Sequence, residues 1–299
     1  MKRILYFILF FVFRLNAQEL TTISTFDQSP ALEQSSIIDD TTLSDEVVNK
    51  QPVKVYKMNY KTVVPIIVVG FSATAYSFSK IYTKTNTPDA TISALNKDNV
   101  PSFDRWATQF HDLNMDKISY YPFYAVMPLP AILFIDRKMR KDALKISVMY
   151  LEAFAFTGVV YGSSVYFVDR YRPDVYNTSL PMSYRHNGNY RNSFFAGHVA
   201  VTATSTFFIA KVYDDYHPES NWKWVIYGGA TAATLGMGYM RLEAGKHFPS
   251  DILLGAIVGA TSGLLTPTLH KNNSKAQKWS VSPALLNNGS SGFSFTYKI

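Results

Sequence analysis

The sequence predicts an all-α fold, a helical bundle of about five to six core helices with a short β-prone C-terminal tail. Six apolar stretches follow residue 60, and most are long enough for helices. None shows the strict alternation of a half-buried strand. Gly, Ala, Ser and Thr are frequent in the last four stretches, as expected where helices pack closely. In chain order the stretches are 62–79, 120–135, 143–168, 198–210, 224–240 and 252–269.

The N-terminus has the form of a secretory signal. Lys2 and Arg3 precede an apolar run over residues 4–13, and the small residue Ala17 ends the segment. The run is too short for a comfortable transmembrane helix, which needs about 20 residues. We therefore expect residues 1–17 to be a signal peptide, with an uncleaved anchor as the alternative. Residues 18–53 are polar and aperiodic, which indicates a disordered or loosely packed leader.

The charge pattern favours a membrane-embedded bundle, although the mean hydropathy of −0.03 is low for a protein with many spans. Four basic residues lie within 137–141, and the positive-inside rule places this loop in the cytoplasm. A translocated N-terminus followed by six spans would invert that arrangement. We therefore expect 62–79, which contains Pro65 and Gly70, not to cross, leaving five crossings. A soluble periplasmic bundle is the alternative.

Composition excludes several functional classes. The chain has no cysteine, which excludes disulfides, cysteine–zinc sites and a thiol nucleophile. The net charge of +7 is spread over helix ends and no recognition motif is present, so no nucleic-acid partner is expected. The final residues, 279–299, contain alternating aromatic residues and predict the β-prone tail.

A histidine and a carboxylate lie at the junction of the last two helices. His247 and Asp251 are four residues apart, so a helix face or a turn around Pro249 would bring them together. A carboxylate on one imidazole nitrogen fixes the tautomer and raises the basicity of the other, as a histidine nucleophile requires. Arg241 would present a guanidinium fork to phosphate oxygens. A surface loop with a salt-linked His–Asp pair is the alternative.

Two further clusters lie at helix ends. Gly197 and His198 open an apolar helix, whose N-terminal amides can bind an anion, and His198 could protonate a leaving oxygen. Arg170 and Arg172 supply guanidinium groups just before Pro173. Each cluster has a simpler interpretation, namely a capped histidine and a basic helix end before a proline. In chain order, the first cluster is 170–173, the second is 193–198, and the third comprises Arg241, His247 and Asp251. Together the three clusters predict an oxyanion site.

The order and spacing of these motifs resemble the type 2 phosphatidic acid phosphatase (PAP2) superfamily, which includes secreted acid phosphatases and vanadium haloperoxidases. Its signature is Lys-x6-Arg-Pro, then Pro-Ser-Gly-His, then Ser-Arg-x5-His-x3-Asp. The matching residues are Arg172-Pro173, Gly197-His198 and Arg241, His247 and Asp251 at the same spacing. The resemblance covers about residues 120–270. It implies a PAP2-like domain over 54–272 and a tail over 273–299.

The resemblance also implies a mechanism. His247 would attack phosphorus and form a phosphohistidine, Asp251 would orient it, and His198 would be the general acid and later the base for water. The phosphoryl oxygens would be held by Arg172, Arg241 and the Gly197 N–H. No metal or other cofactor is expected, because the arginines supply the positive charge.

Each of the three motifs departs from the signature, at four positions in all. The first-motif lysine falls at Val165, the second-motif proline and serine at Phe195 and Ala196, and the third-motif serine at Met240. The lost lysine and serine are phosphate contacts in the family, and losing a preorganised donor can cost about 10²–10³ in rate. Arg170 could replace the lysine, and Arg191 is a second candidate.

The sequence therefore predicts a phosphohydrolase, either an acid phosphatase or a lipid phosphate or pyrophosphate phosphatase. In an inner-membrane bundle, the site would face the periplasm or exterior, the substrate would be a lipid-linked phosphate ester and the partners membrane lipids. A vanadate-dependent peroxidase and a catalytically degenerate membrane protein of the same fold are the alternatives. The polar segment 174–191 would overhang the site as a lid or specificity loop, or form a simple exposed connection.

Overall fold

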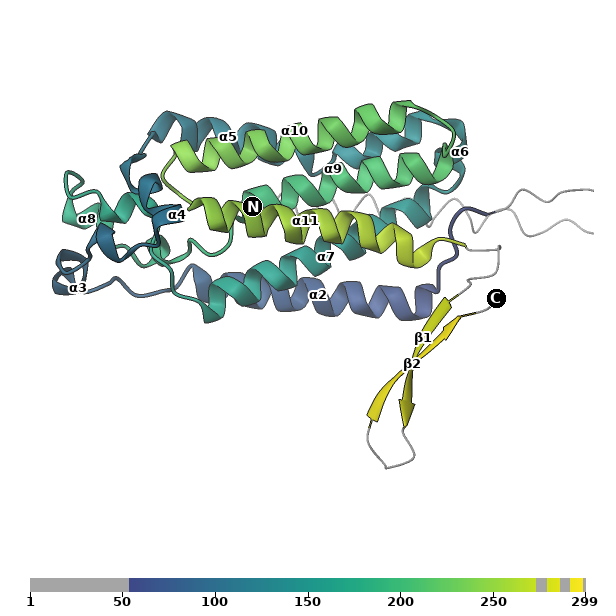
Figure 1. The fold of residues 1–299 in the computed structure, drawn as a ribbon, viewed down its shortest axis with the longest axis horizontal. Coiled ribbons are helices and arrows are strands. Elements are labelled where there is room, and N and C mark those ends of the chain that lie inside the picture. The colour runs from purple at the N-terminus through teal and green to yellow at the C-terminus, as the bar shows by residue number, and fades with distance from the viewer. Residues whose placement is uncertain (1–53, 273–278, 286–290, 298–299) are drawn as a thin grey trace, which may run out of the picture. The chain divides into compact units, whose positions relative to one another are not determined.

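The computed structural model describes residues 54–272, 279–285 and 291–297 of the 299-residue chain (Figure 1). The signal and leader predictions for 1–17 and 18–53 lie outside the described residues. The long helices are α2 (Tyr60–Ile81), α5 (Leu113–Val126), α7 (Ala143–Phe167), α9 (Gly197–Tyr216), α10 (Trp222–Glu243) and α11 (Pro249–His270). Short elements connect them: α3 (Asp89–Ser93), η2 (Lys97–Asn99), α4 (Ser102–Arg105), η3 (Trp106–Gln109), η4 (Leu129–Ile135), α6 (Arg137–Lys141), η5 (Pro173–Tyr176), α8 (Met182–Arg185) and η6 (Gly188–Arg191).

The six long helices form a bundle in which successive helices run in opposite directions (Figure 1). The C-terminal ends of α2, α7 and α10 meet the N-terminal ends of α5, α9 and α11 at one end, beside α3, α4 and α8. We call this the site end. The opposite end carries α6 and the segment before α2, and we call it the basic end. The described helices confirm the predicted all-α bundle.

Close packing of α9 on α11 brings the N-termini of these two helices together. Gly255, Gly259 and Gly263 lie one turn apart along α11 and face the backbone of α9. A Cβ atom on Gly259 would lie 2.1 Å from the carbonyl oxygen of Ala200, so no side chain fits there. The backbone contact therefore requires glycine, and it places the second and third sequence clusters side by side.

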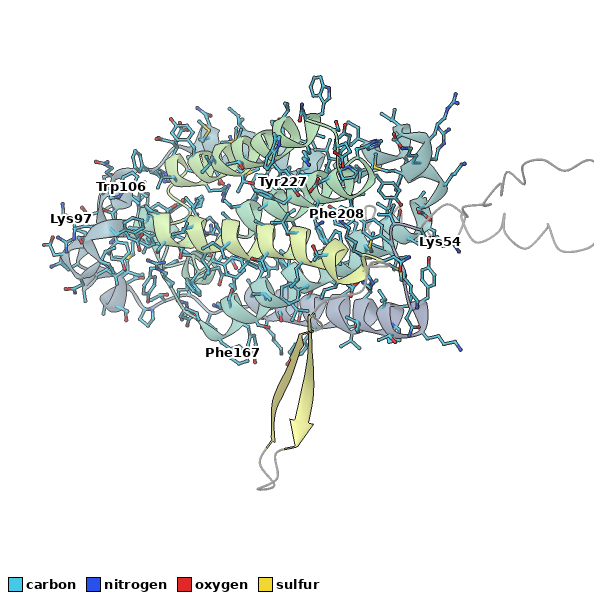
Figure 2. The ribbon with its side chains drawn as sticks, turned by 45° about the vertical axis from the view of Figure 1, so that its right-hand side comes forward. Lys54, Lys97, Trp106, Phe167, Phe208 and Tyr227 are labelled. Atoms are coloured by element: carbon cyan, nitrogen blue, oxygen red, sulfur yellow. The ribbon has the colours of Figure 1, made fainter. Side chains whose placement is uncertain are left out.

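A hydrophobic core stabilises the basic end. It comprises Tyr56, Leu133, Met139, Ile146, Met149, Ala153, Phe208, Val212 and Tyr216, with Phe208 labelled in Figure 2. Tyr56 precedes α2 and is fully buried, and its hydroxyl donates a hydrogen bond to Asp215 over 2.9 Å. The segment before α2 is thereby fixed to the ends of α9 and α11.

Four helical segments are long and apolar enough to cross a membrane, namely Tyr60–Ile81, Leu113–Ile135, Ala143–Phe167 and Pro249–His270. Much of their apolar surface points outward: Val69 is 68 % exposed and Phe167, labelled in Figure 2, is 79 % exposed. Water would not tolerate such large apolar faces, whereas lipid would. The structure therefore indicates a membrane protein.

The structure does not support the expectation that residues 62–79 stay out of the membrane. They lie in α2, a continuous helix of 22 residues that packs along α7 and is one of the four candidate spans. Pro65 lies inside this helix without ending it. Gly70 packs against α7, where an added Cβ atom would lie 3.0 Å from the Cβ of Ala155. This helix is comparable in length and hydropathy to the other three candidate spans. The N-terminal end of α2 and the C-terminal end of α11 both lie at the basic end (Figure 1).

The C-terminal tail forms a β-hairpin. Strands β1 (Trp279–Leu285) and β2 (Ser291–Tyr297) pair antiparallel, with a register that runs from Trp279 opposite Tyr297 to Leu285 opposite Ser291. This confirms the β-prone character predicted for the tail.

Candidate active site

The structure brings the three sequence clusters together at the site end. The amide of Ala196, just before α9, donates a hydrogen bond to the carbonyl oxygen of Asp251 in α11 over 3.0 Å. His247 contacts Ser193 from the second cluster, and Arg170 from the first cluster forms an ion pair with Asp251. Segments up to 81 residues apart in the chain thus meet in one place.

His247 is held as a neutral imidazole with one free nitrogen. It is 3 % exposed, and its Nδ1 lies 2.7 Å from the carbonyl oxygen of Ser193. A carbonyl only accepts hydrogen bonds, so Nδ1 carries the proton and Nε2 carries the lone pair. Burial lowers the pKa of His247 well below its usual value, and the charges of Arg241 and Arg172 lower the pKa further. A nucleophilic histidine needs this form.

The turn that presents His247 depends on a glycine. Gly245 has φ of 67°, and a Cβ atom there would lie 2.3 Å from the carbonyl oxygen of Phe110. An L-residue with a side chain is disfavoured at this φ and would also clash with the backbone. Gly245 therefore fixes the chain two residues before the nucleophile.

The structure corrects the role expected of Asp251. Its carboxylate accepts hydrogen bonds from the Ser193 hydroxyl (2.6 Å) and the Phe248 amide (3.0 Å), and among the described contacts none joins it to His247. Asp251 is the third residue of α11, and a capping box turns its side chain back to the helix start. Asp251 thus orients His247 indirectly, because it holds Ser193, whose carbonyl oxygen holds the imidazole.

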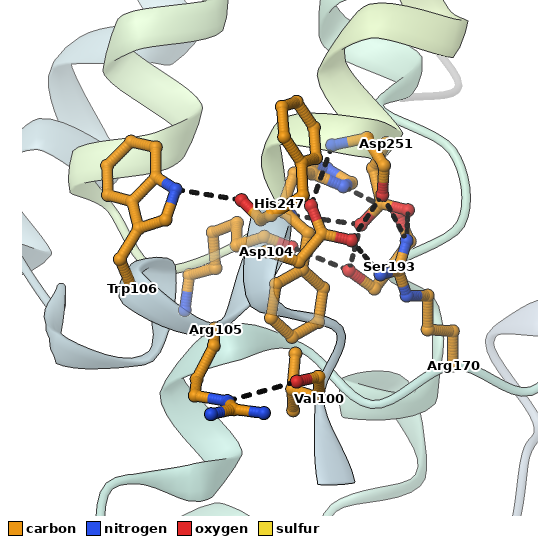
Figure 3. A network of polar contacts seen from close by, with 12 residues as sticks. Val100, Asp104, Arg105, Trp106, Arg170, Ser193, His247 and Asp251 are labelled. Atoms are coloured by element: carbon orange, nitrogen blue, oxygen red, sulfur yellow. Dashed lines mark hydrogen bonds and ion pairs between the residues drawn. The ribbon is translucent and has the colours of Figure 1, made fainter. Parts of the chain in front are cut away.

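Arg170, which the sequence offers as a replacement for the missing lysine, is bound to protein acceptors. Its guanidinium donates to Asp251 and to the Ser250 hydroxyl through one nitrogen, and to Asp104 over 2.7 Å through the other (Figure 3). It also stacks on the ring of Phe248, 4.4 Å from the centroid. These bonds use both N–H groups of one terminal nitrogen and one N–H group of the other, so protein acceptors hold most of the guanidinium.

Arg191, the second candidate, is also engaged elsewhere. Its guanidinium donates to the carbonyl oxygen of Thr85 over 2.9 Å and lies 3.5 Å from the carboxylate of Asp169. Val165, at the position of the family lysine, is fully buried, and its carbonyl oxygen accepts a hydrogen bond from Lys84. None of these basic groups is directed at His247 by the contacts of the described residues.

Three motif residues have buried nitrogens without a protein partner in the described part of the chain: Nε of Arg172, Nε of Arg241 and Nε2 of His198. Arg241 is 1 % exposed, and another of its nitrogens donates to Asp116 (2.8 Å) and Ser119 (2.7 Å). Both arginines lie close enough to His247 to shift its pKa. Buried polar groups are rarely left unpaired, so these three nitrogens form a set that an oxyanion would satisfy.

His198 is positioned by aromatic rings. Its imidazole lies against Phe123, with ring centroids 4.1 Å apart, and meets Tyr120 edge-on at 5.0 Å. Gly197 beside it is required for packing as well as for backbone access, because an added Cβ atom would lie 2.7 Å from the ring of Tyr161. The α9 N-terminus therefore presents its first amides and His198 together.

Lys246 is a site residue that the sequence motifs did not indicate. It directly precedes His247 and is 3 % exposed, and its ammonium group lies 3.0 Å from Asp174 and 2.8 Å from the Tyr184 hydroxyl. Burial lowers the pKa of Lys246, while Asp174 opposes that shift. Asp116 lies 3.8 Å from the same ammonium group and also binds Arg241. One carboxylate thus connects Lys246 to a motif arginine.

Segment 174–191 packs on the site and is not a simple exposed connection. Asp174 is fully buried, and Arg185 is buried and donates to the carbonyl oxygen of Val175 over 2.7 Å. The ring of Tyr190 lies 5.5 Å from the guanidinium carbon of Arg172 and 5.0 Å from the ammonium of Lys246. The segment is therefore an ordered cover that contacts two cations of the site.

Metal coordination has no candidate site in the described ranges: no group of three or more His, Cys, Asp or Glu residues there is arranged to hold an ion. The positive charge of the described site comes from Arg172, Arg241 and Lys246.

Comparisons with known proteins give one sequence-family match and two similar solved structures. Residues 147–275 match the sequence model of the PAP2 superfamily. LpxE from Aquifex aeolicus is similar in structure, with 24 % sequence identity, a TM-score of 0.39 and coverage of 55 % of this chain and 92 % of that chain. A transmembrane PAP2-type phosphatidylglycerolphosphate phosphatase from Bacillus subtilis is also similar in structure. Its sequence identity is 21 %, its TM-score is 0.41, and the match covers 71 % of this chain and 96 % of that chain. No curated protein matches the sequence significantly.

Proposed function

We propose that the chain is a PAP2-type phosphohydrolase that forms a phosphohistidine on His247, because residues 147–275 match the sequence model of that superfamily. One observation carries this proposal: His247 is buried and neutral with Nε2 free, beside two arginines whose buried Nε atoms have no protein partner in the described chain. A nucleophile next to unsatisfied cationic donors suits in-line attack on a phosphoryl group.

In the proposed reaction, Arg172, Arg241 and the Gly197 amide donate hydrogen bonds to the phosphoryl oxygens. Nε2 of His247 attacks phosphorus, and the bond between phosphorus and the leaving oxygen breaks as His198 donates a proton to that oxygen. His198 then takes a proton from water, which attacks the phosphohistidine and releases inorganic phosphate. Burial and the charges of Arg241 and Arg172 lower the pKa of His198 well below 6.5. The negative charge of a bound phosphoryl group opposes this shift, so we propose that His198 takes up its proton together with the substrate.

Asp251 and Arg170 are positioning residues in this proposal. Arg170 fixes Asp251, Asp251 fixes Ser193, and the Ser193 carbonyl oxygen fixes the tautomer of His247. Lys246 adds a buried positive charge next to the nucleophile, which supports phosphate binding where the family lysine is replaced by Val165.

We propose that the substrate is a phosphate ester or pyrophosphate carried by a membrane lipid. Exposed aromatic side chains lie toward the site end: Trp106 is 47 % exposed and Phe167 is 79 % exposed (Figure 2). Tyr82, which follows the C-terminal end of α2, is 60 % exposed. Such residues favour the interface between headgroups and hydrocarbon. The site would then lie at the depth of a lipid headgroup, so a soluble ester would be a poorer substrate.

The proposed orientation places the site end outside the cytoplasm. Six basic residues lie at the basic end: Arg137, Lys138, Arg140 and Lys141 in α6, together with Lys57 and Lys271. The positive-inside rule assigns this end to the cytoplasm. This arrangement keeps the segment before α2 in the cytoplasm and competes with export through a signal at residues 1–17.

Labelling in intact cells decides the orientation. The chain has no cysteine, so a Ser179→Cys variant at the site end and a Lys138→Cys variant at the basic end each carry one thiol. An impermeant maleimide should label the first in intact cells and the second only after permeabilisation. The reverse pattern would place the site in the cytoplasm.

Phosphate release by purified protein in detergent tests the activity. The substrates are phosphatidic acid, phosphatidylglycerol phosphate, undecaprenyl pyrophosphate and p-nitrophenyl phosphate, without added metal. We expect wild-type turnover to vanish in His247→Ala and to persist in His217→Ala, a histidine of the basic end that pairs with Asp136. Folded wild-type protein that binds phosphate or vanadate but turns over none of these substrates would contradict the proposal.

A further inference from the structure

We propose that an anionic phospholipid binds in a groove at the basic end, between α2, α7 and α11 and away from the phosphatase site. Two cavities of about 530 and 520 Å³ lie there. They share three lining residues, Ile66, Glu152 and Leu269, and therefore form one continuous groove. One part of this groove is polar and the other is apolar.

The groove begins where the tight packing of α2 on α7 ends. In the half of α2 nearer the site end, small residues hold the two helices together: an added Cβ atom on Gly158 would lie 2.7 Å from Thr74 Oγ1, and one on Gly162 would lie 2.8 Å from the Ser77 Cβ. Toward the basic end these contacts are replaced by Ile66, which is 52 % exposed and lines both cavities. The helix pair is open on this side.

The apolar part of the groove suits a hydrocarbon chain. Pro65 and Val69 of α2, Phe156 and Val159 of α7, and Leu265 of α11 line it. All three helices are candidate membrane spans, so this part of the groove faces lipid. An acyl chain packed there would cover apolar surface that the described helices leave exposed.

The polar part of the groove suits a phosphate group. Lys57, Asn59 and Lys271 line it, and the ion pair of Glu152 with His270 (2.6 Å) lies at the junction of the two parts. The side chain of Lys57 is exposed, and its ammonium has no ion pair among the described residues. Lys271 binds Asp215, a carboxylate that it shares with Lys211.

The groove therefore has the polarity of a membrane lipid. Cationic groups lie at the outer ends of α2 and α11, at the level of the headgroups, and the apolar cleft extends from there into the membrane-spanning region. Charge complementarity favours an anionic headgroup over a zwitterionic one, since lysines at a membrane surface attract anionic lipids. A bound lipid would brace α2 against α7 and α11.

Native mass spectrometry of the full chain in detergent tests the proposal. The probes are phosphatidylglycerol, phosphatidylcholine and glycerol 3-phosphate. We expect one phosphatidylglycerol to be retained, in preference to phosphatidylcholine, and its affinity to fall by about fivefold or more in Lys57→Glu, because each lysine near a membrane surface contributes about fivefold. The control is Lys61→Glu, an exposed lysine one turn further along that does not line the groove.

Two further variants make the result specific. Val69→Trp should fill the apolar part and reduce retention without any change of charge. His247→Ala should retain the lipid as wild type does, which separates this groove from a lipid bound at the phosphatase site and keeps the test independent of the proposed activity. Any of four results would overturn the proposal. Two concern variants: an equal loss of phosphatidylglycerol affinity in Lys57→Glu and Lys61→Glu, or a loss of phosphatidylglycerol retention in His247→Ala. Two concern probes: retention of phosphatidylcholine, or binding of glycerol 3-phosphate, equal to that of phosphatidylglycerol.

Discussion

Arg170 and Arg172 lie two residues apart, but the structure assigns them opposite roles. Arg170 forms ion pairs with Asp104 and Asp251, which are 3 % and 0 % exposed. Arg172 has no ion pair among the described contacts, and its charge reaches Arg241 and Lys246. Replacement of each arginine by methionine should therefore give opposite results for stability and activity.

The loss of stability expected for Arg170→Met follows from the two carboxylates that would lose their ion-pair partner. Removing one partner of a buried ion pair costs about 3–5 kcal/mol, and the lower value applies because the Arg170 side chain is 22 % exposed. Asp251 retains hydrogen bonds from Ser193 and Phe248, which limits the loss. At about 2–4 °C per kcal/mol, we expect the melting temperature to fall by about 6–12 °C.

Arg172→Met should leave the melting temperature within about 2 °C of wild type, because the change removes a charge that lies near other positive charges. Phosphate release should fall by about 10²–10³, the typical loss for one preorganised donor. The assay is a thermal melt in detergent followed by phosphate release at a temperature where both variants are folded.

The double variant Arg170→Met, Asp104→Asn provides the control. Neutralising Asp104 removes one of the two orphaned carboxylates, so part of the stability should return. An Arg170→Met protein that melts like wild type but has a raised KM would refute the assignment, since that result identifies a phosphate ligand.

Two further predictions concern packing and pH. Gly259→Ala should destabilise the bundle by about 1–3 kcal/mol in a thermal or denaturant melt, because its Cβ would lie 2.1 Å from a carbonyl oxygen of α9. The control is Gly236→Ala, which should be neutral or slightly stabilising because its Cβ would meet nothing within 4 Å. Equal effects of the two substitutions on stability would contradict the packing argument. His247 attacks only when neutral, and burial and two arginines lower its pKa well below 6.5, so kcat/KM should hold into acidic pH and fall only as pH drops through that lowered pKa. Arg172→Gln removes one cause of the lowered pKa, so this acidic limb should move to higher pH; movement to lower pH in the pH–rate profile would show that the limb does not report His247.

The sequence predicts the helices and the motif residues because both depend on local spacing. Apolar stretches mark helices, and the three clusters mark helix ends, where unpaired backbone groups and charges gather. The structure brings Arg172, Gly197, His198, Arg241 and His247 to one end of the bundle, although sequence alone leaves open how they meet. The expectation that these residues share one site rests on the order of their motifs in the chain.

The partners of these residues could not be read from the sequence, because they are distant in the chain or belong to the backbone. Arg170 binds Asp104, which is 66 residues away, and Arg241 binds Asp116, which is 125 residues away. The acceptor for His247 is a backbone carbonyl oxygen, and every residue has one. The clusters therefore indicated which residues meet but not which contacts they make.

The expectation about residues 62–79 has a different origin. The positive-inside rule and an expected signal peptide conflict with six crossings, and excluding this stretch removes the conflict. The structure shows a continuous helix there, in which Gly70 and Thr74 fit closely against Ala155 and Gly158 of α7. Close contacts between small residues of two helices depend on three-dimensional register, which the hydropathy of either helix does not specify.

Trapping the covalent intermediate tests the central claim most directly. Protein turning over a ³²P-labelled phosphate ester is quenched in alkali, which preserves phosphohistidine, and the labelled peptide is identified. We expect the label on His247, no label in His247→Ala, and accumulation in His198→Ala when the leaving group is p-nitrophenol, because its departure needs little acid assistance while hydrolysis still needs the base. Turnover by His247→Ala, or a label on another residue, would contradict the account.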